Sequence, residues 1–181
     1  MATRDRHLTT FTAVALLVVL GDLATKEIAV AFLDDGGASL GALGAWLGSH
    51  VRLVLVGNTR SAFGASLGPH TWAINVGVTL GAIVLIAPVC RELARLDARA
   101  PQSLGLIAGA AGGNLFSLVT SPWGVPDFIA IDHGGGRELV LNVADVAAYA
   151  GLVLMLPLGA AILRRLRESR QVATVPARRG R

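Results

Sequence analysis

Residues 71–90, TWAINVGVTLGAIVLIAPVC, contain no charged side chain and are almost entirely apolar. A helix needs about 17–25 such residues to cross a bilayer. The whole chain has the same character, since 53% of its 181 residues are hydrophobic and only 15% are charged, against about 25% charged in a typical soluble domain. This composition excludes a soluble enzyme, and the low charge excludes a disordered chain.

Three further stretches, about residues 11–33, 103–120 and 143–163, are also long and apolar enough to cross a bilayer. Together with residues 71–90 they predict an all-α integral membrane protein with four transmembrane helices. An alternative is that the first stretch is a cleaved signal peptide, because its basic start and the small residues Ala29-Val30-Ala31 are compatible with cleavage. Cleavage would leave three spans.

Basic residues are unevenly distributed between the segments that join the spans, which sets the expected orientation. The two loops predicted to be external, residues 34–70 and 121–142, contain only three basic residues, Arg52, Arg60 and Arg137. The N-terminus, the loop after the second span and the tail hold Arg4, Arg6, Arg91, Arg95, Arg99, Arg164, Arg165, Arg167, Arg170, Arg178, Arg179 and Arg181. We therefore predict cytoplasmic termini, a single domain over residues 1–168 and a basic, disordered cytoplasmic tail over residues 169–181. The net charge of +4 is read as a topology signal, not as nucleic-acid binding.

The external loops contain strand-like segments. Residues 51–56, VRLVLV, alternate and are β-branched, and they end at a Gly-Asn pair. Residues 127–131 and 137–141 could pair around the glycine turn at 134–136. We expect a small β-sheet on the outer face of the helices.

Ionisable side chains inside a membrane span are costly and are functional candidates by default. Asp22 and Lys26 stand four residues apart, a spacing at which opposite charges meet on one helix face. They either neutralise each other and pin the helix near the outer, headgroup-facing interface, or they act in function. Asp145 has no basic partner in its own span, which suits a general acid or base, although an acid at a helix N-terminus is also favoured by the helix dipole. Another alternative is a small carrier or channel subunit in which the three residues form a polar path.

Five short motifs occur in order along the chain: Asp22-x-x-Thr25-Lys26, Asn58-Thr59-Arg60-Ser61-Ala62-Phe63-Gly64, Gly112-Gly113-Asn114-Leu115-Phe116, Val125-x-Asp127-Phe128-Ile129 and Leu141-Asn142-Val143-Ala144-Asp145. Over about residues 11–163 the chain resembles the type II (lipoprotein) signal peptidases. The resemblance implies a membrane aspartic peptidase of the bacterial cytoplasmic (inner) membrane, with four transmembrane helices and an outer β-cradle. Its expected partners are lipidated prolipoprotein signal peptides and membrane lipid. It would cut the signal peptide from diacylglyceryl-modified prolipoproteins just before the lipidated Cys, and it needs no metal or cofactor.

The resemblance also implies a catalytic pair of aspartates. Asp145 matches the second member within the Asn-x-Ala-Asp pattern. The first member is expected three residues after Asn114, followed by Arg, but this chain has Ser117 and Leu118 there. A serine hydroxyl does not act as a carboxylate base near neutral pH, and loss of a general base costs about 10²–10⁴ in rate.

Several interpretations of Ser117 follow. Asp132 or Glu138, both in the outer loop, could replace the missing acid, or Ser117 could form a nucleophilic dyad with Lys26. Alternatively, the protein is a catalytically inactive membrane binding protein on the same scaffold. The retention of Asp145 with its Asn and Ala neighbours favours an active enzyme.

The remaining matches imply substrate-binding residues. By resemblance these hold the peptide backbone and shape the pocket, and they are Asn58, Phe63, Asn114, Asp127 and Asn142. Arg60 stands where the family has Gly, which alters the substrate mouth or anchors a lipid headgroup. The single Cys90 excludes an intramolecular disulfide and a cysteine metal site.

Overall fold

The computed structural model describes residues 2–33, 50–59 and 70–173. In this part of the chain, four helices are long and apolar enough to cross a membrane. They are α1 (Ala2–Phe32), α3 (Thr71–Leu93), α4 (Ala100–Thr120) and α5 (Val143–Ala173). The predicted fold class is confirmed. Helix α5 continues to Ala173, so the first residues of the segment predicted as a disordered tail are helical, and residues 174–181 lie outside the described part.

The outer surfaces of these helices are apolar. Leu17 on α1, Val84 on α3 and Leu156 on α5 are 72%, 69% and 68% exposed. Exposed apolar residues on this scale, on several long helices, are the pattern of helices that face lipid.

Helix α1 packs closely along α4 because small residues of α4 leave room for its backbone. A Cβ added to Gly109 would lie 2.6 Å from the carbonyl oxygen of Ala15, and one added to Gly105 would lie 2.8 Å from that of Phe11. Small residues four apart allow such close approach between membrane helices. The packing makes α1 part of the bundle and argues against the alternative in which this segment is cleaved off.

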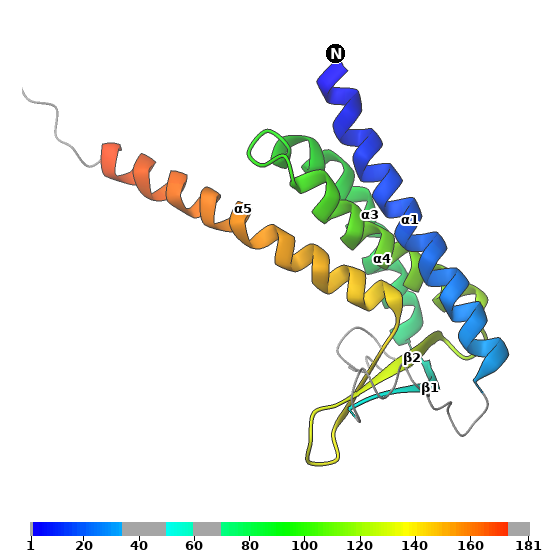
Figure 1. Cartoon of the computed structure of the whole chain (residues 1–181). Coiled ribbons are helices and arrows are strands. Elements are labelled where there is room, and N and C mark those ends of the chain that lie inside the picture. Colours follow the sequence, from blue (N-terminus) through cyan, green and yellow to red (C-terminus); the bar gives the residue numbers. More distant parts are fainter. Residues whose placement is uncertain (1, 34–49, 60–69, 174–181) are drawn as a thin grey trace, which may run out of the picture.

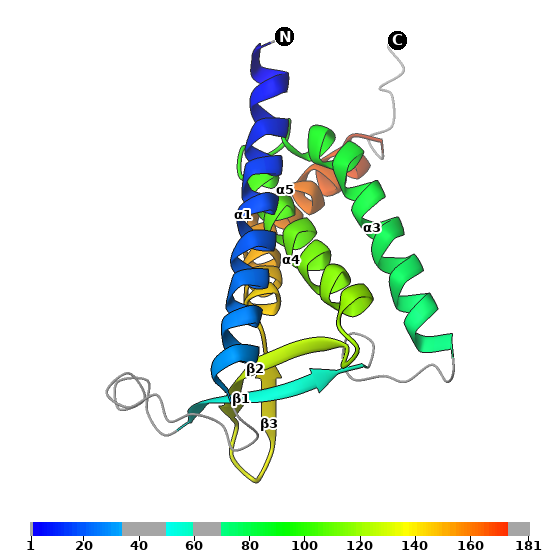
Figure 2. The ribbon, with the colours of Figure 1, turned by 90° about the vertical axis from the view of Figure 1, so that its right-hand side faces the viewer.

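Three antiparallel strands, β1 (Val51–Asn58), β2 (Val125–Asp132) and β3 (Glu138–Leu141), form a sheet in the order β1-β2-β3. The sheet lies across one end of the bundle, opposite the N-terminus and the α3–α4 connection (Figure 1, Figure 2). Gly134–Gly136, between β2 and β3, have positive φ angles, as the predicted glycine turn requires.

A small apolar cluster attaches the sheet to the end of α1. Ala29 of α1 and Leu33, just after the helix, pack with Phe128 of β2, and Leu53 and Val143 pack against them. Phe128 follows Asp127 in the same strand. The cluster therefore fixes the position of Asp127 relative to the ends of the helices.

Candidate active site

A cavity of about 520 Å³ lies where α3, α4 and the start of α5 meet the sheet. Its walls are formed by apolar residues of the three helices and by seven polar residues: Asn58, Asn75, Thr79, Asn114, Asp127, Asn142 and Asp145.

 The carboxyl groups of Asp127 and Asp145 therefore open onto one cavity, although the two residues come from a strand and a helix.

Asp145 is held at the start of α5 by a reciprocal pair of hydrogen bonds with Asn142. The backbone N–H of Asp145 donates to Asn142 Oδ1 (2.9 Å), and the backbone N–H of Asn142 donates to Asp145 Oδ2 (3.1 Å). This is a capping box, in which the residue before the helix and the third helical residue satisfy each other's N–H groups. Asp145 is therefore an acid at the N-terminus of a helix, as one of the two interpretations expected. Its other carboxylate oxygen, Oδ1, remains available to a different partner.

Asn142 also binds the second carboxylate. Because its Oδ1 is used in the capping box, its Nδ2 points the other way and donates to Asp127 Oδ1 (2.6 Å). Asn58 Nδ2 donates to Asp127 Oδ2 (2.9 Å). The sheet register explains this contact, since Asn58 pairs with Val125 and so stands diagonally across from Asp127 on the same face.

The environment of Asp127 favours retention of a proton. Its side chain is buried, with 4% of the residue exposed. Burial is the largest cause that raises the pKa of the Asp127 carboxyl, and the nearby charge of Asp145 also raises it. The hydrogen bonds from Asn58 and Asn142 and the charge of Lys26 lower it, and the resulting pKa is about 6. Asp127 therefore keeps its proton up to a higher pH than an ordinary aspartate.

Helix α1 supports Asp145 through α4. Lys26 Nζ forms the predicted ion pair with Asp22 Oδ2 (2.6 Å) and also donates to Asn114 Oδ1 (2.7 Å). Asn114 Nδ2 then donates to Asp145 Oδ1 (3.0 Å). Asp22 and Lys26 are 0% and 3% exposed, so they do not face lipid headgroups.

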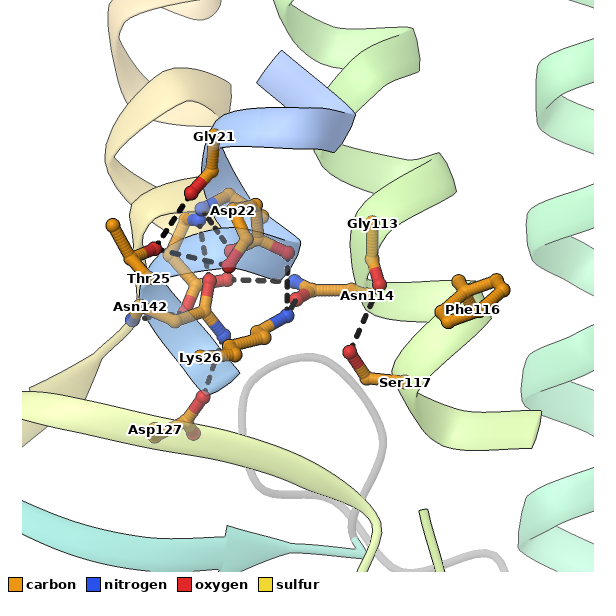
Figure 3. A network of polar contacts seen from close by, with 12 residues as sticks. Gly21, Asp22, Thr25, Lys26, Gly113, Asn114, Phe116, Ser117, Asp127 and Asn142 are labelled. Carbon is orange, nitrogen blue, oxygen red and sulfur yellow. Dashed lines mark hydrogen bonds and ion pairs between the residues drawn. The ribbon is translucent and has the colours of Figure 1, made fainter. Parts of the chain in front are cut away.

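Asp22 has a second role at the start of α5. Its Oδ1 accepts a hydrogen bond from the backbone N–H of Ala144 (2.9 Å), in the first turn of that helix. The hydrogen bonds therefore run without a break from Asp22 through Lys26, Asn114, Asp145, Asn142 and Asp127 to Asn58. Figure 3 shows Asp22, Lys26, Asn114, Asn142 and Asp127 of this network. Each carboxylate oxygen of Asp127 and Asp145 accepts a hydrogen bond from an amide N–H.

Ser117 does not join Asp145 in this cavity. Its hydroxyl donates to the carbonyl oxygen of Gly113 in its own helix (3.1 Å; Figure 3). Ser117 lines a different cavity, of about 400 Å³, between α1, α4 and the start of β2. Lys26 also borders that cavity, but its ammonium group is bound to Asp22 and Asn114, which disfavours the Ser117–Lys26 dyad.

The other acids considered as replacements lie away from the cavity. Asp132 accepts a hydrogen bond from the N–H of Gly134 (2.7 Å) in the β2–β3 turn, and Glu138 pairs with Arg52 on the sheet surface. Arg60 and Phe63 lie outside the described residues. Within the described ranges, no group of three His, Cys, Asp or Glu side chains is placed to hold a metal ion.

Two polar residues of α3, Asn75 and Thr79, also line the cavity and were not predicted from the sequence. They are four residues apart in an otherwise apolar span, and this spacing was a usable signal because it places both on one helix face. Asp127 was predicted as a substrate-binding residue, and its position on the same cavity as Asp145 is visible only in the structure.

The fold and the site define an integral membrane protein in which a buried aspartate, Asp127, and a half-buried one, Asp145, line one cavity where the helices meet the sheet. Residues 14–159 match the family of signal peptidase (SPase) II. The chain is 31% identical to the lipoprotein signal peptidase of Mycobacterium leprae (strain Br4923) over 158 residues, which covers 84% of this chain and 72% of that relative. It is 30% identical to the lipoprotein signal peptidase of Mycolicibacterium smegmatis over 154 residues, which covers 84% of this chain and 62% of that relative.

Two solved structures of bacterial membrane enzymes, determined by the in meso method, have the same fold. One has a TM-score of 0.69 at 18% identity and covers 94% of this chain and 96% of its own. The other has a TM-score of 0.69 at 20% identity and covers 82% of this chain and 91% of its own. The chain belongs to the signal peptidase II family, whose members are aspartic-type hydrolases.

Proposed function

We propose that this protein cleaves the signal peptide of diacylglyceryl-modified prolipoproteins just before the lipidated Cys, with Asp127 and Asp145 as its catalytic pair. One observation carries the proposal: in a member of this family, Asn142 is hydrogen-bonded to both carboxylates at the wall of one cavity. The pair is complete without an acid at Ser117.

The two carboxyl groups have different tasks. Asp127, with its pKa raised to about 6, holds the proton and polarises the scissile carbonyl. Asp145 takes a proton from the attacking water, and the hydrogen bonds from Asn114 and the Asn142 N–H hold its side chain in place for this step. Water oxygen bonds to the carbonyl carbon, the C–N bond breaks, and a proton passes to the leaving nitrogen.

The membrane orientation follows from the distribution of charge. The N-terminal end of α1, the α3–α4 connection and the C-terminal end of α5 lie at one end of the bundle, opposite the sheet (Figure 1). Arg91 is in the last turn of α3, and Arg95 and Arg99 are in the connection that follows it. Basic residues favour the cytoplasmic side. We therefore assign the protein to the bacterial cytoplasmic membrane with both termini inside, so that the aspartates act near the outer surface, where lipidated substrates and membrane lipid meet.

A binding protein without catalytic activity was the alternative suggested by Ser117. That alternative required the catalytic pair to be incomplete. The shared contacts of Asp127 and Asp145 with Asn142 support an active enzyme instead.

The test is a cleavage assay in detergent with a purified diacylglyceryl-modified prolipoprotein, read as a shift on a gel. Wild type is expected to cleave. Asp127→Asn and Asp145→Asn should each lower the rate by about 10²–10⁴ or more, because each removes one member of a mutually dependent pair. Ser117→Ala is the matched control and should cleave like wild type. Loss of cleavage in Ser117→Ala, with Asp127→Asn still active, would overturn the assignment of the pair.

A further inference from the structure

Helix α3 presents two polar side chains to the cavity, Asn75 and Thr79. Both are half-buried, and both stand one helical turn apart on the face that lines the cavity. The start of α3 is tied to α4, because Trp72 Nε1 donates to the carbonyl oxygen of Leu118 (3.1 Å). This contact fixes the turn that precedes Asn75.

The two side chains differ from the other amides of the cavity in their bonding. Asn58, Asn114 and Asn142 all donate to Asp127 or Asp145. Within the described part of the chain, no hydrogen bond is formed by the side chain of Asn75 or Thr79. Among the described residues on the α3 wall of the cavity, these two polar side chains are therefore available to bind a ligand.

An uncommitted amide in a membrane helix is costly and indicates a ligand or a functional role. A peptide bond inside a helix is shielded, because its carbonyl accepts a hydrogen bond from the residue four positions on. A substrate segment that presents its scissile carbonyl to Asp127 and Asp145 must therefore be unwound. Its freed backbone N–H and C=O groups then need partners, because the surrounding bilayer offers none.

We propose that Asn75 and Thr79 bind the main chain of the substrate beside the scissile bond, on the side of the cavity formed by α3. This inference rests on the proposed function. A side-chain amide and a hydroxyl each donate and accept, so together they match a peptide's N–H and C=O groups. Because they contact main chain, they hold the unwound segment whatever its side chains, while the aspartates act on its carbonyl from the other wall.

The inference is tested with Asn75→Leu and Thr79→Val, which keep the approximate shape and remove the hydrogen-bonding groups. Each should lower kcat/KM by about fivefold to tenfold, mainly through a higher KM, the size of effect expected for a lost hydrogen bond. Asn75→Gln keeps the amide and should recover part of the loss. Thr12→Val, on the exposed face of α1 away from the cavity, is the matched control and should behave like wild type.

Substrate affinity provides a second readout that does not require cleavage. In an Asp127→Asn background, the Kd for an uncleaved diacylglyceryl-modified prolipoprotein should rise by about the same factor when Asn75→Leu is added. Gel filtration and thermal unfolding identify any variant that does not fold, and Asn75→Gln then carries the test. Unchanged KM and Kd in both removing variants would overturn the inference. If wild type does not cleave but binding still depends on Asn75, the proposed function fails and the inference stands.

Discussion

The two cavities on either side of α4 differ in how their polar groups are bound. In the larger one, Asp127 and Asp145 receive amide hydrogen bonds and share Asn142. In the smaller one, the hydroxyl of Ser117 is bound to its own helix and the ammonium group of Lys26 is bound elsewhere. Asn114 and Ser117 are only three residues apart on α4, yet they face different cavities. Asn114 belongs to the candidate active site, whereas Ser117 has a packing role.

Lys26 lines the smaller cavity and donates a hydrogen bond to Asn114, which lines the larger one, so its replacement is expected to have the largest effect. Lys26→Met should lower the free energy of unfolding by about 3–5 kcal/mol, because it leaves the buried carboxylate of Asp22 without its partner. It should also lower kcat, because the orientation of the Asn114 amide is no longer fixed by Nζ. Thermal unfolding in detergent and the cleavage assay measure the two effects.

The control is Glu27→Gln, an exposed neighbour that lines only the smaller cavity. It should change the free energy of unfolding by no more than about 0.5 kcal/mol. A Lys26→Met variant as stable as wild type would show that the ion pair does not connect the helices as described.

Helix α4 lines both cavities and packs against α1, and Gly109 tests this packing. Gly109→Ala places a Cβ 2.6 Å from the carbonyl oxygen of Ala15, which is backbone and yields little. We expect a loss of about 1–3 kcal/mol in the free energy of unfolding, measured by thermal unfolding. Gly81→Ala on α3 is the matched control, since nothing lies within 4 Å of its added Cβ. Equal stability of the two variants would contradict the close packing.

The smallest expected effect concerns the pH dependence of the larger cavity. The Asp127 proton is lost as pH rises through its pKa of about 6, so kcat/KM should fall on the alkaline side with a midpoint near that value. Asn58→Ala removes a hydrogen bond that favours the ionised form, and the midpoint should therefore move to higher pH. A pH–rate profile of both proteins measures the shift, and movement to lower pH would rule out Asp127 as the proton donor. Ser117→Ala should leave the midpoint in place.

Much of the fold followed from local pattern. The four spans were visible because a bilayer requires long apolar helices, and the strands were visible from alternation and glycine turns. The ion pair of Asp22 and Lys26 was also predictable, because residues four apart meet on one face of a helix. These features depend on neighbours in sequence.

The active site could be predicted only in part. Asp145 stood out as an acid inside a span, but the relation of Asp127 to it did not, because the two are joined through strand register and the amide of Asn142. The sequence placed Ser117 at a catalytic position because it lies three residues after Asn114. Which cavity its side chain faces depends instead on the helices that pack against each face of α4.

The sequence by itself determined the membrane spans, the small sheet and the family, because these depend on composition, periodicity and ordered motifs. Only the tertiary structure decided which two carboxyl groups share a cavity and where Asn75 and Thr79 face. The physical reason is that hydrogen bonds between side chains act over about 3 Å. Partners so close in space are brought together by packing and register across distant segments, which no local pattern records.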